Sequence, residues 1–129
     1  KGQGVKILNP EVIRHNYHWA SKANPSDNKT IAKFKKELMV PSEGGFDKPE
    51  FIRAVCDIHP WMVGWIAVME NGYATVTDAQ GAFRIDGIPP GKYRVACWQE
   101  TLAQSPVTLE VTLEAGKPAT IRFPLSHKK

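Results

Sequence analysis

Apolar and polar residues alternate with a period of two through most of the second half of the chain. This alternation predicts half-buried β-strands, because successive side chains along a strand point to opposite faces. Turn residues interrupt it at short intervals, which is typical of antiparallel strands. The predicted strands are residues 73–77, 82–85, 107–113 and 119–123, with one more after the turn at 89–91. Together they predict a small β-sandwich.

The first half of the chain also has mainly strand character. "GVKIL" at residues 4–8 and "EFIRAVC" at 50–56 are the clearest strand candidates, and Gly44-Gly45 lies between them as a turn signal. We place the boundary between two modules near Met69–Gly72, which divides the chain into residues 1–69 and 70–129. The predicted fold class is therefore all-β.

Residues 26–38 are the exception to this pattern, and we predict a short helix there. Polar residues that can cap a helix come first. The apolar positions near one helical face are Ile31, Phe34 and Leu38. The solvent-exposed face of this helix is expected to carry Lys33, Lys35 and Lys36.

Composition narrows the class of protein. With 129 residues, 42% hydrophobic and 23% charged, the chain is expected to fold into one or two soluble globular units. The most apolar run, residues 61–69, is about half of what a membrane-spanning helix needs. No apolar signal region follows Lys1, so any export signal is expected to have been removed or never to have existed.

Charge and motifs exclude several functions. The net charge of +4 is spread along the chain without a concentrated basic stripe, so no nucleic-acid partner is predicted. The chain also lacks a glycine-rich phosphate loop, a nucleophile elbow and a pattern of paired carboxylates. We therefore do not expect an enzyme.

The segment "CDIHPWM" is the strongest chemical signal in the sequence. Alternation along the preceding strand points Cys56 to the same side as Ile52 and Ala54. Pro60 stops regular structure, so that His59 and Met62 lie in a tight loop that can turn back toward the sulfur. Thiolate, imidazole and thioether suit copper, whose electron-transfer sites use two histidines, one cysteine and a distant axial methionine.

A second histidine is needed for such a site, and "IRHNYHW" offers two. His15 is the better candidate, because the neighbouring Asn16 can connect the two ligand-bearing segments by hydrogen bonds. His18 remains the alternative. His127 lies in a charged terminal segment and is the weakest candidate.

"HN" about forty residues before "CDIHPWM" resembles the cupredoxins, and the Cys-x-x-His-x-x-Met spacing resembles the short amicyanin-type loop. The resemblance implies a Greek-key sandwich, of the plastocyanin and amicyanin type, that binds one type 1 copper and transfers single electrons. The copper ligands it implies are His15, Cys56, His59 and Met62. It also implies a periplasmic or extracellular location and a partner such as a c-type cytochrome or another redox protein. Pro60 and Trp61 are then expected to form an apolar collar where that partner docks.

"VTDAQGAFRIDGIPPGKYRVACW" resembles a second family, the carboxypeptidase-regulatory-like domains with a transthyretin-like sandwich. The Thr-Asp-x-x-Gly hairpin and the Pro-Pro-Gly turn carry this resemblance. The predicted architecture is therefore a cupredoxin-like domain packed next to a small transthyretin-like domain.

The first resemblance departs from its family at the N-terminus. Only fourteen residues precede His15, so the first strands of a cupredoxin are lacking. An uncovered edge strand invites unwanted pairing. We therefore expect either that the N-terminal strands have been lost to processing, or that the second module or a partner chain covers the edge formed by residues 5–8.

Three alternatives to a copper electron-transfer site stay open. A closed zinc site can be built from two upstream histidines together with Cys56 and His59. Cys56 and Cys97 permit one disulfide. The same motif also fits a structural β module, or a protein that stores or delivers copper without redox turnover.

Overall fold

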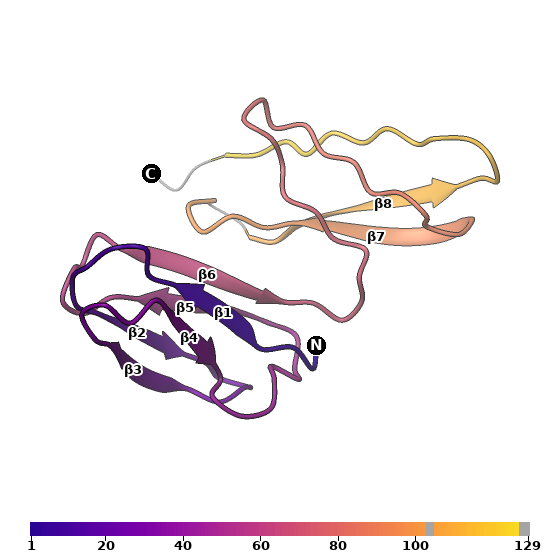
Figure 1. Cartoon of the computed structure of the whole chain (residues 1–129). Helices are drawn as coiled ribbons and strands as arrows, with labels where there is room; N and C mark the ends of the chain where they lie inside the picture. The colour runs from indigo at the N-terminus through magenta and orange to yellow at the C-terminus, as the bar shows by residue number, and fades with distance from the viewer. Residues whose placement is uncertain (103–104, 127–129) are drawn as a thin grey trace. The chain divides into compact units, whose positions relative to one another are not determined.

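The computed structural model describes residues 1–102 and 105–126, and His127 lies outside the described residues. All regular elements in this part of the chain are β-strands, which confirms the all-β prediction. The chain separates into two units, Lys1–Val76 and Thr77–Lys129 (Figure 1), and each is described by itself. In the described residues, no helix has the length and apolar character needed to span a membrane.

The N-terminal unit contains two antiparallel sheets. The larger has the strand order β3-β2-β5-β6, and β1 and β4 form the smaller one. The strands are β1 (Val5–Leu8), β2 (His15–Ala20), β3 (Asp27–Ile31), β4 (Glu37–Val40), β5 (Glu50–Val55) and β6 (Val63–Val68). The predicted strands at 4–8 and 50–56 are thus present as β1 and β5.

Strand register brings the chemically interesting segments to one end of this unit. His18 lies opposite Val55, so the start of β2 lies beside the loop that follows β5. Val55 in turn pairs with Val63, and the intervening seven residues close a hairpin. His15 and "CDIHPWM" therefore meet at the same end of the larger sheet.

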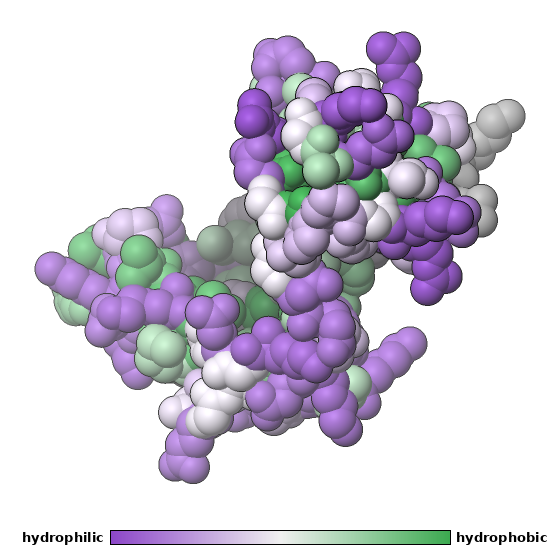
Figure 2. Space-filling model, turned by 90° about the vertical axis from the view of Figure 1, so that its right-hand side faces the viewer, coloured by the Kyte–Doolittle hydropathy of each residue, from purple (hydrophilic) through white to green (hydrophobic). Residues whose placement is uncertain are grey.

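A buried core holds the two sheets of the N-terminal unit together. The cluster draws residues from both sheets and from the β4–β5 connection, and it consists of Trp19, Val40, Phe46, Ile52, Ala54 and Val68. Each large aliphatic or aromatic side chain buried in this way contributes about 1.5–3 kcal/mol. The indole N–H of Trp19 donates to the Pro25 carbonyl at 2.8 Å, so the core contains a satisfied polar group. On the face shown in Figure 2, hydrophilic residues predominate, as expected when apolar side chains turn inward.

The helix predicted at residues 26–38 is wrong. These residues form β3, a turn and β4. Ile31 pairs with His15 of β2, and Leu38 pairs with Ile7 of β1. Two separate strand partners therefore override a spacing of apolar residues that also fitted a helix.

One strand, β1, precedes β2, and it pairs only with β4 among the described residues. The other edge of β1 has no strand beside it in this part of the chain. The expected cover for that edge, the second module or a partner chain, stays a prediction.

The C-terminal unit contains β7 (Gly91–Cys97) and β8 (Val107–Leu113), paired antiparallel along their full length. Inward and outward positions alternate strictly along both strands, and Tyr93, Val95 and Cys97 share the half-buried face, as predicted. Tight turns are also present near the predicted positions: Gly81 N–H donates to the Asp78 carbonyl at 3.0 Å.

The predicted strands at 73–77, 82–85 and 119–123 are not formed as regular strands in the described residues. These runs follow extended paths without a ladder (Figure 1). In the run 73–77 the apolar side chains gain little from burial, as Val76 is 90% exposed and Tyr73 is 46% exposed. Without a buried face, alternation does not fix the register of a strand.

Candidate metal centre

Cys56 is positioned by the strand before it. Ile52, Ala54 and Cys56 are 0%, 2% and 5% exposed and lie on one face, as strand alternation predicts. The following loop is closed by two backbone hydrogen bonds: Cys56 N–H donates to the Met62 carbonyl at 3.1 Å, and Met62 N–H donates to the His59 carbonyl at 2.9 Å. This closure places Nδ1 of His59 3.5 Å from the Cys56 sulfur.

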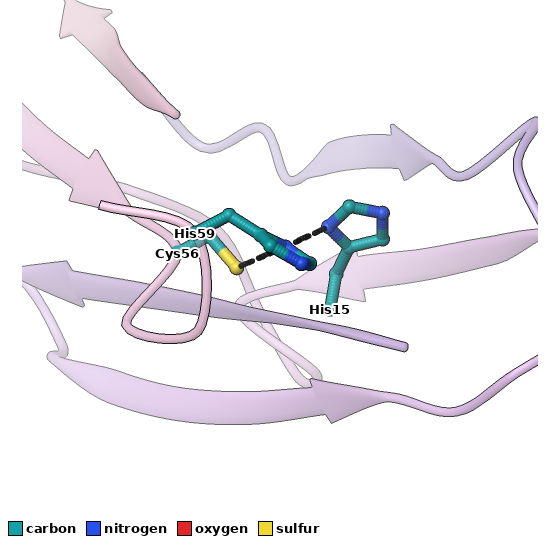
Figure 3. A group of neighbouring side chains, drawn as sticks. All are labelled: His15, Cys56 and His59. Carbon is teal, nitrogen blue, oxygen red and sulfur yellow. Dashed lines mark hydrogen bonds between the residues drawn. The ribbon is translucent and has the colours of Figure 1, made fainter. Parts of the chain in front are cut away.

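His15, at the start of β2, completes a three-residue group (Figure 3). Its Nδ1 lies 3.9 Å from Sγ of Cys56 and 3.1 Å from Nδ1 of His59. Metal–nitrogen and metal–sulfur bonds are about 2.0 and 2.3 Å long, and three ligands of one ion then lie about 3–4 Å apart. The separations in this group fit that requirement. The group can hold a metal ion, and the ion's identity is a separate question.

Asn16 connects the segments that carry the group. Its Oδ1 accepts from the Asp57 N–H at 2.8 Å and lies 3.3 Å from the Cys56 sulfur. Its Nδ2 donates to Asp57 Oδ2 at 2.8 Å and to Asn28 Oδ1 at 2.7 Å. One buried amide therefore joins β2, β3 and the Cys56 loop.

His18 is turned away from the group. Its Nδ1 lies 3.0 Å from Asp57 Oδ1, and its side chain is 42% exposed. Residues an odd number of positions apart on a strand point to opposite faces. His15 and His18 are three positions apart, so they cannot both face Cys56. The structure therefore brings His15, and not His18, beside the thiol.

Glu11 belongs to the site although the sequence did not suggest it. Its Oε2 lies 3.1 Å from Nε2 of His15. When the ring is neutral, a proton on Nε2 donates to this carboxylate and leaves the lone pair of Nδ1 for a metal ion; when the ring is charged, Nδ1 donates to the Cys56 thiolate instead. Buried Asn9 shapes the segment around Glu11, because its Oδ1 accepts from Glu11 N–H at 3.2 Å and its Nδ2 donates to the Ile13 carbonyl at 3.3 Å. This connection is irregular, so no periodic sequence signal marks Glu11.

Electrostatics favour the ligand form of the thiol. Burial by itself raises the pKa of Cys56, but hydrogen bonds from the backbone of Asn16, from His15 and from the backbone of the loop outweigh burial and lower the pKa to about 6. The pKa of His15 is raised, chiefly by its hydrogen bond with Cys56, against the opposing effect of burial. A thiolate is the form of cysteine that binds metals. Both cysteines are free thiols, one in each unit, and the disulfide between them stays an alternative.

Met62, Trp61 and Pro60 lie at the open side of the group. Met62 lines a hollow of about 480 Å³ together with His15 and Cys56, and its side chain is 43% exposed. The ring of Trp61 lies 5.4 Å from that of His59, and Trp61 is 77% exposed. Pro60 is also exposed. Both the weak axial ligation predicted for Met62 and the docking role predicted for Pro60 and Trp61 stay predictions.

Fold and site together define an all-β protein with a buried His-Cys-His group that can hold a metal ion. Residues 66–126 match the carboxypeptidase regulatory-like domain, so the C-terminal part of the chain is such a domain, as expected. The match begins within β6, and the division into compact units falls after Val76. No cupredoxin family model matches the chain. No curated protein and no solved structure gave a significant match.

Proposed function

We propose that the N-terminal unit is a cupredoxin-like domain that transfers single electrons at one copper ion. The observation that carries this proposal is the convergence of one thiolate and two imidazole Nδ1 atoms from His15, Cys56 and His59. This donor set is the trigonal arrangement of blue-copper sites, and Met62 lies beside it for weak axial ligation. Copper bound there would supply one-electron chemistry by alternating between its cuprous and cupric states.

The chain's own contribution is to hold the ligands still. Asn16 fixes the Cys56 loop against two strands, and Glu11 fixes the ring of His15. Outer hydrogen bonds of this kind set ligand orientation and basicity. A site that changes little between oxidation states suits electron transfer.

His59 is the proposed exit for the electron. It is half-buried, and the exposed ring of Trp61 lies against it. An apolar collar of Pro60 and Trp61 suits brief docking of a c-type cytochrome or another redox protein. We propose a periplasmic or extracellular location, because electron carriers of this kind exchange electrons with redox proteins there. Four protein ligands leave no open position for a substrate, which supports a carrier over an enzyme.

Copper is favoured over zinc by the orientation of His18. The closed zinc alternative needs His18 as a fourth strong ligand, but that ring is held by Asp57. In the proposed site, Met62 adds a thioether to the three strong donors His15, Cys56 and His59, and such a set suits copper better than zinc.

The test is the metal content and visible spectrum of the protein purified from its own host. We expect one copper per chain and an intense visible absorption that disappears on reduction. Cys56→Ser should abolish the absorption, whereas the matched variant Cys97→Ser should retain it. A colourless copper(II) complex or one bound zinc would overturn the proposal, and stable copper without reversible reduction would favour storage or delivery.

A further inference from the structure

The turn between β3 and β4 presents an aromatic ring in a strained conformation. Phe34 has a φ of 68°, in the left-handed region where a bulky residue is rare. In this conformation the Cβ of a residue other than glycine lies too close to the following carbonyl oxygen. The ring is 66% exposed, so burial does not offset the strain. Strained residues of this kind concentrate at functional sites.

Three lysines flank Phe34 in the sequence of this turn. Lys33, Lys35 and Lys36 are all exposed, and none forms an ion pair among the described residues. The ammonium group of Lys33 lies 4.9 Å from the centre of the Phe34 ring. The turn therefore shows both an apolar surface and unpaired positive charge.

The nearby acidic groups are already engaged. Glu37 pairs with Lys6 at 3.1 Å, Glu11 with His15 at 3.1 Å, and Asp57 with His18 at 3.0 Å. These three carboxylates therefore have other partners, and no ion pair joins the lysines of the turn to a carboxylate among the described residues. Their charge is directed toward solvent.

The turn lies at the same end of the unit as the candidate metal centre. Strand β3 ends at Ile31, directly opposite His15. The Lys36 carbonyl accepts from Asn9 N–H at 2.8 Å, and Asn9 and Pro10 line the hollow beside Cys56. In Figure 1 the β1–β2, β3–β4 and β5–β6 connections lie together at one end. A partner docked over His59 therefore reaches this turn.

We propose that residues 32–36 form the electrostatic docking element for an acidic redox partner protein. The lysines attract carboxylates of the partner, and Phe34 supplies an apolar anchor beside the metal centre. This inference rests on the proposed function and adds to it that the redox partner is acidic. A protein is favoured over a lipid surface because the turn adjoins the apolar collar at the metal centre.

The test measures electron transfer from the reduced copper protein to ferric cytochrome c, with one electron passing from cuprous copper to haem iron. Two forms of the same oxidant are compared: native cytochrome c, which is basic, and cytochrome c with succinylated lysines, which is acidic. Lys35→Glu/Lys36→Glu should lower the rate with the acidic form about tenfold at low salt, because steering by charge changes association rates by 10-fold or more. The effect should largely vanish at 1 M salt, where the Debye length is about 3 Å. With the basic form the variant should not be slower.

The matched control is Lys22→Glu/Lys48→Glu, which makes the same change in net charge at exposed positions near the other end of the sheet. It should change the rate less than twofold. Equal effects of the two double variants would show that only net charge matters and would overturn the proposal. If the unmodified protein shows no copper-dependent redox activity, the proposed function is overturned instead.

Phe34→Gly separates docking from stability. Glycine adopts positive φ without strain, so the unfolding midpoint should rise. The rate with the acidic cytochrome should fall nevertheless, because the anchor is lost. An unchanged rate would overturn the role of Phe34. Sedimentation with phosphatidylserine vesicles that depends on Lys35 and Lys36, together with no charge effect on the cytochrome reaction, would assign the turn to a lipid surface instead.

Discussion

The two units of this chain bury their apolar residues in different ways. The N-terminal unit has a core in which Trp19, Val40, Phe46 and Ile52 are almost fully enclosed. In the described part of the C-terminal unit only Leu102 is buried to a similar degree, and β7 and β8 alternate between half-buried and exposed positions. A metal site needs ligands held by a rigid surrounding, and the group His15-Cys56-His59 lies at one end of the unit that has such a core.

The largest expected effect is on core packing. Ile52→Ala in β5 should destabilise the N-terminal unit by about 2–5 kcal/mol, because it removes a fully buried side chain and leaves a cavity. Val95→Ala in β7, which is half-buried, should cost about 1 kcal/mol. Amide hydrogen exchange reports the two units separately. Equal losses at both positions would contradict the contrast between the units.

The next effect concerns a polar network at the end of the sheet opposite the metal centre. The Glu50 carboxylate accepts from the Ser21 hydroxyl, from Lys22 N–H at 2.6 Å and from Asn24 Nδ2 at 3.0 Å. Burial raises the pKa of Glu50, but these hydrogen bonds outweigh burial and lower the pKa to about 2.

This lowered pKa makes the stability of the N-terminal unit dependent on pH. A carboxyl with a depressed folded-state pKa contributes its full stability above the unfolded value of 4.5 and loses it as pH falls toward about 2. Glu50→Gln should therefore cost about 2 kcal/mol near neutral pH and flatten the acid limb of the stability curve. Denaturation at several pH values measures this. Glu110→Gln on β8 is the control and should change stability by less than about 0.5 kcal/mol; an equal loss there would count against the network.

The smallest effect on stability is expected at Glu11. Its role is measured instead by which nitrogen of the His15 ring carries the proton. Glu11→Gln keeps an oxygen that can accept from Nε2 of His15 but removes the charge. Stability should change by less than about 1 kcal/mol, as for Glu114→Gln, which breaks the exposed pair with Lys117 in the C-terminal unit.

Two measurements check the role of Glu11. In the metal-free protein, at a pH high enough for the His15 ring to be neutral, nitrogen NMR should show that ring protonated on Nε2 in the parent chain and in Glu11→Gln, but a mixture of tautomers in Glu11→Ala. In the copper form, the reduction potential should rise in both variants, because a negative charge beside a ligand stabilises the cupric state. Unchanged tautomers in Glu11→Ala would show that Glu11 does not orient the ring.

The local alternation of apolar and polar residues was sufficient to predict much of the fold. Strands β1, β5, β7 and β8 follow directly from alternation, and Cys56 faces inward for the same reason. The helix expected at residues 26–38 failed because Ile31 and Leu38 found partners in strands distant in sequence. The strand expected at residues 73–77 failed because alternation without a buried face does not specify pairing.

For the candidate site, the sequence by itself determined which residue types are available and that Cys56, His59 and Met62 share one short loop, since Pro60 and the preceding strand constrain that loop locally. Only the tertiary structure decided that His15 rather than His18 faces the thiol, because that depends on the register between β2 and β5. It also decided that Glu11 contacts His15 and that Phe34 points into solvent. These features lie in irregular connections, where contacts between segments rather than a local period fix the backbone.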